Sequence, residues 1–106
     1  MKLGIIIYSN DPETIWNAFR FANHARKENE QVSIFLLGKG VESETIVSVK
    51  FNVVEQMRIF VESQGKIYAC GICLKIREKG SSDLCSLSSM SDLYRLVKES
   101  DTVISF

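Results

Sequence analysis

The 106-residue sequence has no excess of charge of either sign, because lysine plus arginine and aspartate plus glutamate both number 13. Like charges do not gather into a block either, so the electrostatic footprint of a nucleic-acid-binding protein is missing. The longest apolar runs, such as residues 3–8 and 34–37, are strand-sized and far shorter than the roughly 20 residues that a membrane span needs. The N-terminus has no small-residue cleavage site of a secretory signal. These absences predict a cytoplasmic protein with neither a nucleic-acid nor a membrane partner.

Histidine and proline occur once each, and the glycine-rich motifs that cradle phosphates do not occur. The histidine, His24, falls on the polar side of a predicted helix, so a C-x-x-C zinc site could add only Cys85 as a soft ligand. The proline, Pro12, lies far upstream of the C-x-x-C pair, whereas a thioredoxin-like fold places a cis-proline after its cysteines. We therefore expect no metal and no cofactor, and we do not favour a thioredoxin-like fold.

Length and composition predict one globular domain. The hydrophobic fraction of 45% and the charged fraction of 25% are typical of globular proteins. A core of this size has a large surface-to-volume ratio, so self-association would be a plausible source of further burial. The three cysteines, an odd number without a secretion signal, argue for free or redox-active thiols rather than a disulfide framework.

Strand and helix signals alternate along the chain, and residues 41–50 between them show no strong period and predict a long connection. Helix starts are indicated by the Asp11-Pro12 pair, by Asn52 and by the capping-box spacing of Ser89 and Asp92. The expected strands are residues 3–8, 31–37, 66–69, 83–87 and 102–106. The expected helices are residues 12–28, 53–64, 71–79, and 90 onward. Gly65 is expected to end the second helix in a left-handed conformation, and Leu93, Leu96 and Val97 are expected to face inward from the last one. This alternation predicts a three-layer α/β/α domain with a mostly parallel five-stranded sheet.

The first predicted helix has an unusually broad apolar surface. Trp16 and Phe21 flank its inward face on opposite sides, so the apolar arc is too wide for packing on one sheet face alone. Either this helix forms a subunit interface, or the two large side chains lie under neighbouring loops.

The main candidate for chemistry is the C-x-x-C pair of Cys70 and Cys73, which follows the third predicted strand. Reactive groups gather beyond the carboxyl ends of parallel strands. Cys70 would lie at the start of a helix, where unpaired N–H groups favour a nucleophilic thiolate. Gly71 would leave space over the sulfur, and Cys73 has the spacing of a resolving thiol. The alternative is that both cysteines are small packing residues.

Two further groups could line the same site. Cys85 could face it as a third thiol, although packing is the favoured interpretation. Ser9 and Asn10 follow the first strand and could help to bind an anion, but Asp11 would repel one, so capping of the helix is favoured.

Three segments together resemble the DsrE/DsrF-like family, and the resemblance spans essentially the whole chain. They are Tyr8 to Thr14, Phe35 to Val41, and above all Gly65 to Cys73 followed by Arg77. The resemblance is greatest to the small single-domain prokaryotic members.

The resemblance implies a five-stranded α/β/α fold and a homo-oligomer, a trimer or a hexamer. It also implies a cysteine at a strand end, matching Cys70, that accepts sulfur as a persulfide from a donor protein and passes it to an acceptor protein. A second thiol at Cys73 is shared by only some members. We therefore predict a sulfur carrier or sulfurtransferase-like protein. The alternatives are an oligomeric binding or regulatory module and a thiol redox sensor.

Overall fold

The structure is a computed structural model that describes all residues, 1–106. Five strands alternate with helices, as the sequence predicts. The strands are β1 (Lys2–Ile7), β2 (Gln31–Leu36), β3 (Lys66–Cys70), β4 (Ser86–Ser88) and β5 (Thr102–Ser105). The helices are α1 (Pro12–Lys27), α2 (Val53–Glu62), α3 (Gly71–Ile76) and α4 (Met90–Glu99), and a 3-10 helix, η1, covers Gly38–Thr45. None of these helices is both long enough and apolar enough to cross a bilayer.

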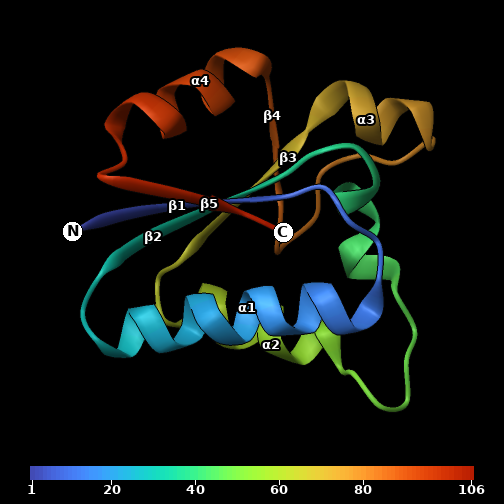
Figure 1. The fold of residues 1–106 in the computed structure, drawn as a ribbon. Helices are drawn as coiled ribbons and strands as arrows, with labels where there is room; N and C mark the ends of the chain where they lie inside the picture. The colour runs from blue at the N-terminus through green and yellow to red at the C-terminus, as the bar shows by residue number, and fades with distance from the viewer.

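All five strands are parallel and form one sheet in the order β4-β3-β2-β1-β5. Helices α1 and α2 lie side by side on one face, and α4 lies on the other (Figure 1). Helix α4 belongs to the connection from β4, at one edge of the sheet, to β5, at the opposite edge. The prediction of a three-layer α/β/α fold is therefore confirmed.

The hydrophobic core lies mainly between the sheet and the pair of helices α1 and α2. Alternate residues of β1 and β2 point into it and are almost fully buried. Phe19 of α1 and Phe60 of α2 meet there edge to face, with ring centroids 6.0 Å apart. On the opposite face α4 buries only Leu96, whose side chain lies over Gly4 of β1. The two faces of the sheet are thus covered very unequally.

Several local predictions were wrong in detail. Helix α2 ends through Gln64, which takes the left-handed conformation with φ of 72°, and not through Gly65. Gly65 is required because a Cβ there would lie 2.4 Å from the Phe60 ring. Val97 of α4 is 46% exposed, because α4 packs on the core through Leu96 and the partly buried Leu93 and turns Val97 outward.

The bounds of three other segments also differ from the prediction. Helix α3 stops at Ile76, since Glu78 adopts a positive φ of 55°. Strand β4 begins only at Ser86, because residues 82–85 form a turn in which the Ser82 N–H donates to the Cys85 carbonyl. The first half of the predicted connection is the 3-10 helix η1, which buries Val41 and Ser43.

The two large residues that flank α1 have different surroundings. Trp16 packs on Phe51 of the connection that precedes α2, with centroids 5.3 Å apart, and the Arg20 guanidinium covers its ring. Phe21 is 47% exposed, and its ring lies beside that of Phe106, after β5, with centroids 6.4 Å apart. The loop-packing interpretation therefore describes Trp16, whereas Phe21 leaves an apolar surface at the β5 edge.

Candidate functional site

The candidate site lies at the carboxyl edge of the sheet, where the parallel strands β1, β2 and β3 end next to one another. Cys70 is the last residue of β3 and also the N-cap residue of α3, which begins at Gly71 without an intervening loop. Gly38 begins η1 just after β2, and Asn10 follows β1. Strand pairing alone therefore brings three connections of the chain together around Cys70.

The Cys70 and Cys73 thiols are neighbours at the first turn of α3, near enough for the Cys70 thiol to raise the pKa of Cys73. Cys70 is almost fully buried, with 4% of its surface exposed, whereas Cys73 is partly exposed. Both thiols are free. The main-chain N–H of Gly38 donates a hydrogen bond to the Cys73 sulfur at 3.3 Å. Cys73 is thus the more accessible member of a thiol pair whose inner member is Cys70.

Opposing effects act on ionisation of the Cys73 thiol. Burial raises its pKa, and the neighbouring Cys70 thiol raises it further. The Gly38 N–H and the nearby Arg77 guanidinium lower it, because both stabilise negative charge on the sulfur. The net direction is upward. An N–H and a guanidinium beside a sulfur are nevertheless the groups that would stabilise a thiolate or a persulfide anion once it forms.

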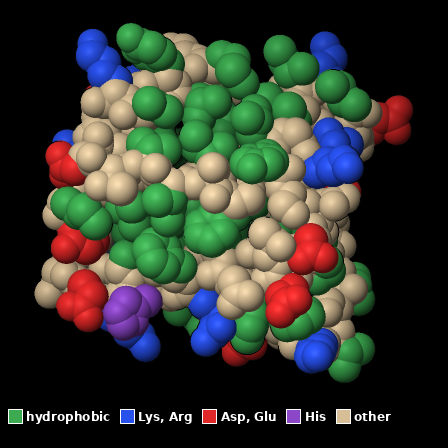
Figure 2. All heavy atoms as spheres, viewed as in Figure 1, with side chains coloured by type: hydrophobic (Ala, Val, Ile, Leu, Met, Phe, Trp, Pro, Cys, Tyr) green, Lys and Arg blue, Asp and Glu red, His purple; other side chains and the backbone are tan.

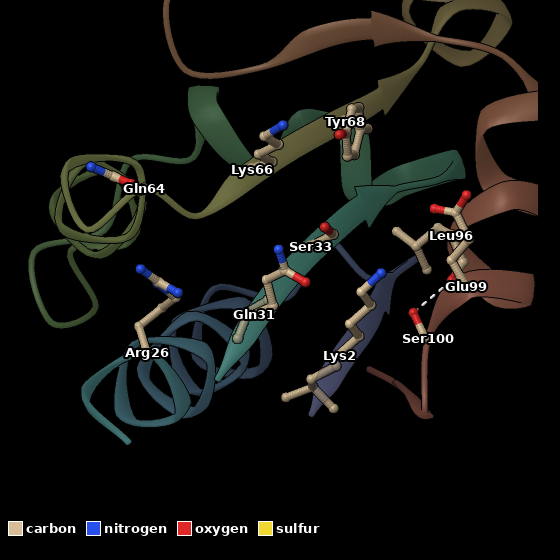
Figure 3. A pocket seen from close by; sticks show the side chains of 12 residues that line it. Lys2, Arg26, Gln31, Ser33, Gln64, Lys66, Tyr68, Leu96, Glu99 and Ser100 are labelled. Atoms are coloured by element: carbon tan, nitrogen blue, oxygen red, sulfur yellow. Dashed lines mark hydrogen bonds between the residues drawn. The ribbon is translucent and has the colours of Figure 1, made fainter. Parts of the chain in front are cut away.

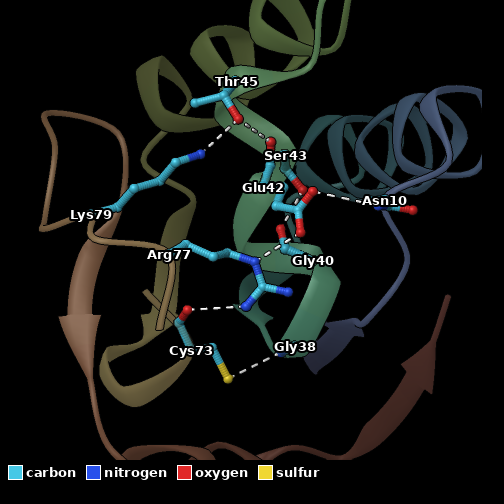
Figure 4. A network of polar contacts seen from close by, with 9 residues as sticks. All are labelled: Asn10, Gly38, Gly40, Glu42, Ser43, Thr45, Cys73, Arg77 and Lys79. Carbon is cyan, nitrogen blue, oxygen red and sulfur yellow. Dashed lines mark hydrogen bonds and ion pairs between the residues drawn. The ribbon is translucent and has the colours of Figure 1, made fainter. Parts of the chain in front are cut away.

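Arg77 joins α3 to the neighbouring connections (Figure 4). Its Nε donates to the Glu42 carboxylate of η1 at 2.8 Å, and another of its nitrogens donates to the main-chain carbonyl of Cys73 at 3.0 Å. The Asn10 amide donates to the other Glu42 oxygen at 3.4 Å. The Arg77 hydrogen bond, followed by the Asn10 bond, lowers the pKa of Glu42, so that its carboxylate stays charged. This network holds the segment around Cys73 against η1.

Two glycines make the η1 side of the site possible. Gly38 has a left-handed backbone with φ of 56°, which glycine adopts without strain. A Cβ on Gly40 would lie 1.9 Å from the Ile7 carbonyl oxygen, so the chain passes over the end of β1 too closely for any side chain. The glycines allow the Gly38 N–H to reach the Cys73 sulfur.

The remaining candidate residues have different surroundings. Gly71 packs against β4, where a Cβ would lie 3.2 Å from the Ser88 carbonyl oxygen. Ser9 accepts a hydrogen bond from the Asp11 N–H within its own turn, and Asp11 caps α1 by accepting from Thr14. The structure therefore brings Asn10, through Glu42 and Arg77, into the network of the cysteine pair, and gives Ser9 a local role in the turn.

Cys85 lines a separate hollow of about 280 Å³. Its neighbours there include Glu44 of η1 and Lys79 and Ser82 of the connection before β4, but neither of the other cysteines. Burial, together with the Glu44 carboxylate, raises the pKa of Cys85 to about 12. A thiol in these surroundings stays protonated, which suits packing rather than nucleophilic chemistry.

No group of three or more histidine, cysteine, aspartate or glutamate side chains is arranged to hold a metal ion. His24 lies on the exposed side of α1, 3.6 Å from the Glu28 carboxylate. Residue spacing in the sequence did not indicate that Glu42 or the Gly38 N–H belongs to the site. The one sequence feature that points to this connection is Gly38-Lys39-Gly40, directly after a buried strand.

Comparison with known proteins gives a consistent result. The sequence profile of the DsrE/DsrF-like family matches residues 1–106, the whole chain. An uncharacterized protein of Methanocaldococcus jannaschii is 37% identical over 114 residues, which cover 100% of both chains. Another, from Methanopyrus kandleri, is 37% identical over 101 residues, covering 89% of this chain and 83% of its own.

Two solved structures share the fold at low sequence identity. The YchN protein from E. coli superposes with a TM-score of 0.86 at 18% identity, covering 100% of both chains. A conserved protein of unknown function from Bacteroides thetaiotaomicron superposes with a TM-score of 0.80 at 18% identity, covering 99% of this chain and 94% of its own. The family is associated with sulfur relay, and its proteins commonly form oligomers.

Proposed function

Since this chain belongs to the DsrE/DsrF-like family, we propose that it is a cytoplasmic sulfur carrier that holds sulfane sulfur as a persulfide on Cys70 and relays it to a partner protein. The observation that carries the proposal is the placement of two neighbouring free thiols at the start of α3, one of which accepts a hydrogen bond from the Gly38 N–H. Three free cysteines also suit a reducing compartment.

Loading would be a thiol–persulfide exchange. The Cys70 thiolate attacks the outer sulfur of a donor persulfide, R–S–SH, so that a new S–S bond forms at Cys70 and the donor leaves as the thiolate R–S⁻. Relay repeats this step in the opposite direction. An acceptor thiolate attacks the outer sulfur of Cys70–S–SH, and Cys70 leaves as its thiolate. No external oxidant or reductant is needed in either step.

Cys73 offers a second way to unload the sulfur. Its thiolate can attack the inner sulfur of the Cys70 persulfide, which forms a Cys70–Cys73 disulfide and expels the outer sulfur as HS⁻. The proximity of the two thiols supports this role. A reductant in the cell, such as a small thiol, would then have to restore the pair before another cycle.

Access to Cys70 sets a condition on the proposal. Because Cys70 is 4% exposed and Cys73 is partly exposed, a donor must approach from the Cys73 side of α3. The outward surface of α3 carries Ile72 and Ile76, which are 71% and 73% exposed and lie one helical turn apart. An apolar surface beside a reactive thiol is where a sulfur-donor or sulfur-acceptor protein would dock.

We also propose that the chain forms a homo-oligomer, a trimer or a hexamer, through the surface around the edge strand β5. Figure 2 shows hydrophobic side chains gathered on the face that carries α1, β5 and α4. Phe21, Val97 and Val103 are among the exposed apolar residues of these elements. An unpaired parallel edge strand flanked by apolar side chains is a favourable site for self-association. Sedimentation of the protein across a range of concentrations tests this part of the proposal.

The test of sulfur loading is intact-protein mass spectrometry after incubation with a persulfide donor. The wild type and the control variant Cys85→Ser should each gain the mass of one sulfur atom. Cys70→Ser should gain none, and Cys73→Ser should gain one and keep it longer, because the internal release step is lost. A sulfur atom that remains bound in Cys70→Ser but disappears when Cys73 is alkylated would overturn the assignment of Cys70.

A thiol redox sensor is the second candidate, and the proximity of Cys70 and Cys73 favours it as well. It predicts reversible loss of two free thiols at mild redox potentials without any gain of sulfur mass. The burial of Cys70 favours a third candidate, an oligomeric binding module in which the cysteines only pack. That candidate predicts neither sulfur loading nor disulfide formation, and native thiols that resist a water-soluble reagent.

A further inference from the structure

The amino edge of the sheet, opposite the cysteine edge, carries a group of polar and charged side chains. Lys2, Gln31 and Lys66 are the first residues of β1, β2 and β3. The strand register places Lys2 beside Gln31 and Ser33 beside Lys66. Because strand residues alternate between faces, these side chains and that of Tyr68 project from the same face, the one that α4 covers. Three adjacent strands thus present polar groups to a common space.

That space is a real hollow. It has a volume of about 240 Å³ and is bounded on one side by Leu96 and Glu99 of α4 and by Ser100, the C-cap residue of that helix. Figure 3 shows the side chains of Lys2, Gln31, Ser33 and Lys66 over the three strands, with Arg26 across from α4. Central strands covered on both faces normally carry apolar side chains. Here α4 packs on β1 and leaves the first residues of β2 and β3 uncovered on this face. Those uncovered positions carry polar side chains.

The hollow is cationic although the protein as a whole has no net charge. Lys2, Arg26 and Lys66 line it, against Glu99 as the single carboxylate. None of the three cations takes part in an ion pair. Arg26 is held by the main-chain carbonyls of Glu30 and Ser63, which fix its guanidinium without neutralising it.

Neutral donors accompany these charges. The one side-chain hydrogen bond that joins two of the labelled lining residues runs from Ser100 to the Leu96 carbonyl (Figure 3). The hydroxyls of Ser33 and Tyr68 and the Gln31 amide therefore remain available to a ligand. Cations combined with hydroxyl and amide donors are the groups that bind phosphate oxygens.

We propose that this hollow binds the phosphate group of a small molecule, with Lys2 and Lys66 as the charged contacts. Its volume is slightly below the roughly 300–1,000 Å³ typical of sites for drug-sized ligands, which suits a phosphate with a small organic part. Lys66 begins β3 and Cys70 ends it, so the phosphate site and the thiol pair occupy opposite ends of one strand. The site does not depend on the proposed sulfur chemistry.

The test is an NMR titration of ¹⁵N-labelled full-length protein at constant ionic strength, with inorganic phosphate, glycerol 3-phosphate and, as a reference, chloride. The two phosphate probes should produce saturable shifts in the amides of residues 2–4, 31–33 and 66–68. Tighter binding of glycerol 3-phosphate would identify a phosphate ester as the ligand class, and equal binding would identify the free anion. Shifts that match those in chloride, or that do not saturate, would overturn the proposal.

Charge variants provide the matched controls. Lys2→Gln and Lys66→Gln should each weaken phosphate binding about tenfold, as loss of one charge-assisted contact does. Glu99→Gln should strengthen binding, because it removes the one carboxylate that lines the hollow. Lys27→Gln and Lys98→Gln change the net charge equally but lie outside the hollow, and they should leave the affinity unchanged. Equal weakening by these control variants would show that binding reflects overall charge alone and would refute the site.

Discussion

Glu42 and Glu44 lie two residues apart on η1, but Glu42 belongs to the surroundings of Cys73 and Glu44 to those of Cys85. Glu42 accepts a hydrogen bond from Arg77, the residue that also holds the Cys73 carbonyl. Glu44 has no such cation on its carboxylate and lies beside Cys85, whose pKa it helps to raise. In a 3-10 helix of three residues per turn, positions i and i+2 point in different directions, so one short segment supplies both sites.

The comparison shows that burial alone does not decide what a cysteine can do. Burial raises the pKa of both Cys73 and Cys85. Beside Cys73, an N–H and a guanidinium oppose that effect, whereas beside Cys85 a carboxylate adds to it. The sign of the neighbouring charge therefore separates a thiol suited to chemistry from one suited to packing.

The largest expected effect is a difference in alkylation rate. With a pKa of about 12, Cys85 should react with iodoacetamide at pH 7 about a thousandfold more slowly than an ordinary thiol of pKa ~8.5, because only the thiolate reacts. Peptide mass spectrometry at successive times follows each cysteine separately. In denaturant the three rates should become equal. Native Cys85 reacting as fast as Cys73 would remove the distinction between the two environments.

A smaller change in rate should follow from Glu44→Gln. Removing the carboxylate lowers the pKa of Cys85, but burial, the larger cause, remains, so alkylation of Cys85 should become only several-fold faster. The same alkylation assay measures it, and Glu55→Gln, an exposed residue of α2, is the control. No change in the Cys85 rate would mean that burial alone protects this thiol.

Arg77→Gln should loosen the cysteine segment. Loss of the bonds to Glu42 and to the Cys73 carbonyl should lower the thermal midpoint by a few degrees and speed hydrogen exchange in α3. Arg95→Gln is a matched control, because its ion pair with Asp92 is longer, at 3.5 Å, and lies on the surface. Equal effects of both substitutions would show that Arg77 has no special part in holding α3.

The smallest expected effect is on the pH dependence of stability. The folded state lowers the pKa of Glu42, so its ion pair stabilises the fold fully above the unfolded pKa of about 4.3 and loses that effect as the pH falls through the lower folded value. Urea midpoints of the wild type and Glu42→Gln should therefore differ at pH 7 and converge toward pH 3. A difference that persists at pH 3 would assign the stabilisation to packing instead of charge.

Much of the fold could be predicted because its signals are local. The N-caps Asp11, Asn52 and Ser89 were recognised from residue type and spacing, and each side chain accepts a hydrogen bond in the first turn of its helix. The bounds that could not be predicted depend on distant contacts. Gly65 resembles a helix stop in the sequence, but glycine is needed there because any side chain would clash with the Phe60 ring.

The candidate site likewise has features that the sequence predicts and features that it does not predict. That Cys70 ends a strand and precedes a helix follows from the order of residues, and so does the spacing that brings Cys73 beside it. That Glu42 meets Arg77, 35 residues further along, could not be inferred, because no local pattern links η1 to α3.

By itself the sequence determined the alternation of strands and helices, the helix caps and the position of the C-x-x-C pair, since hydrophobic period, capping and turn chemistry act over a few residues. Only the tertiary structure decided which charge each thiol meets, how deeply Cys70 is buried and that Lys2 and Lys66 share a hollow. These properties depend on strand order and register, which bring together residues distant in the chain.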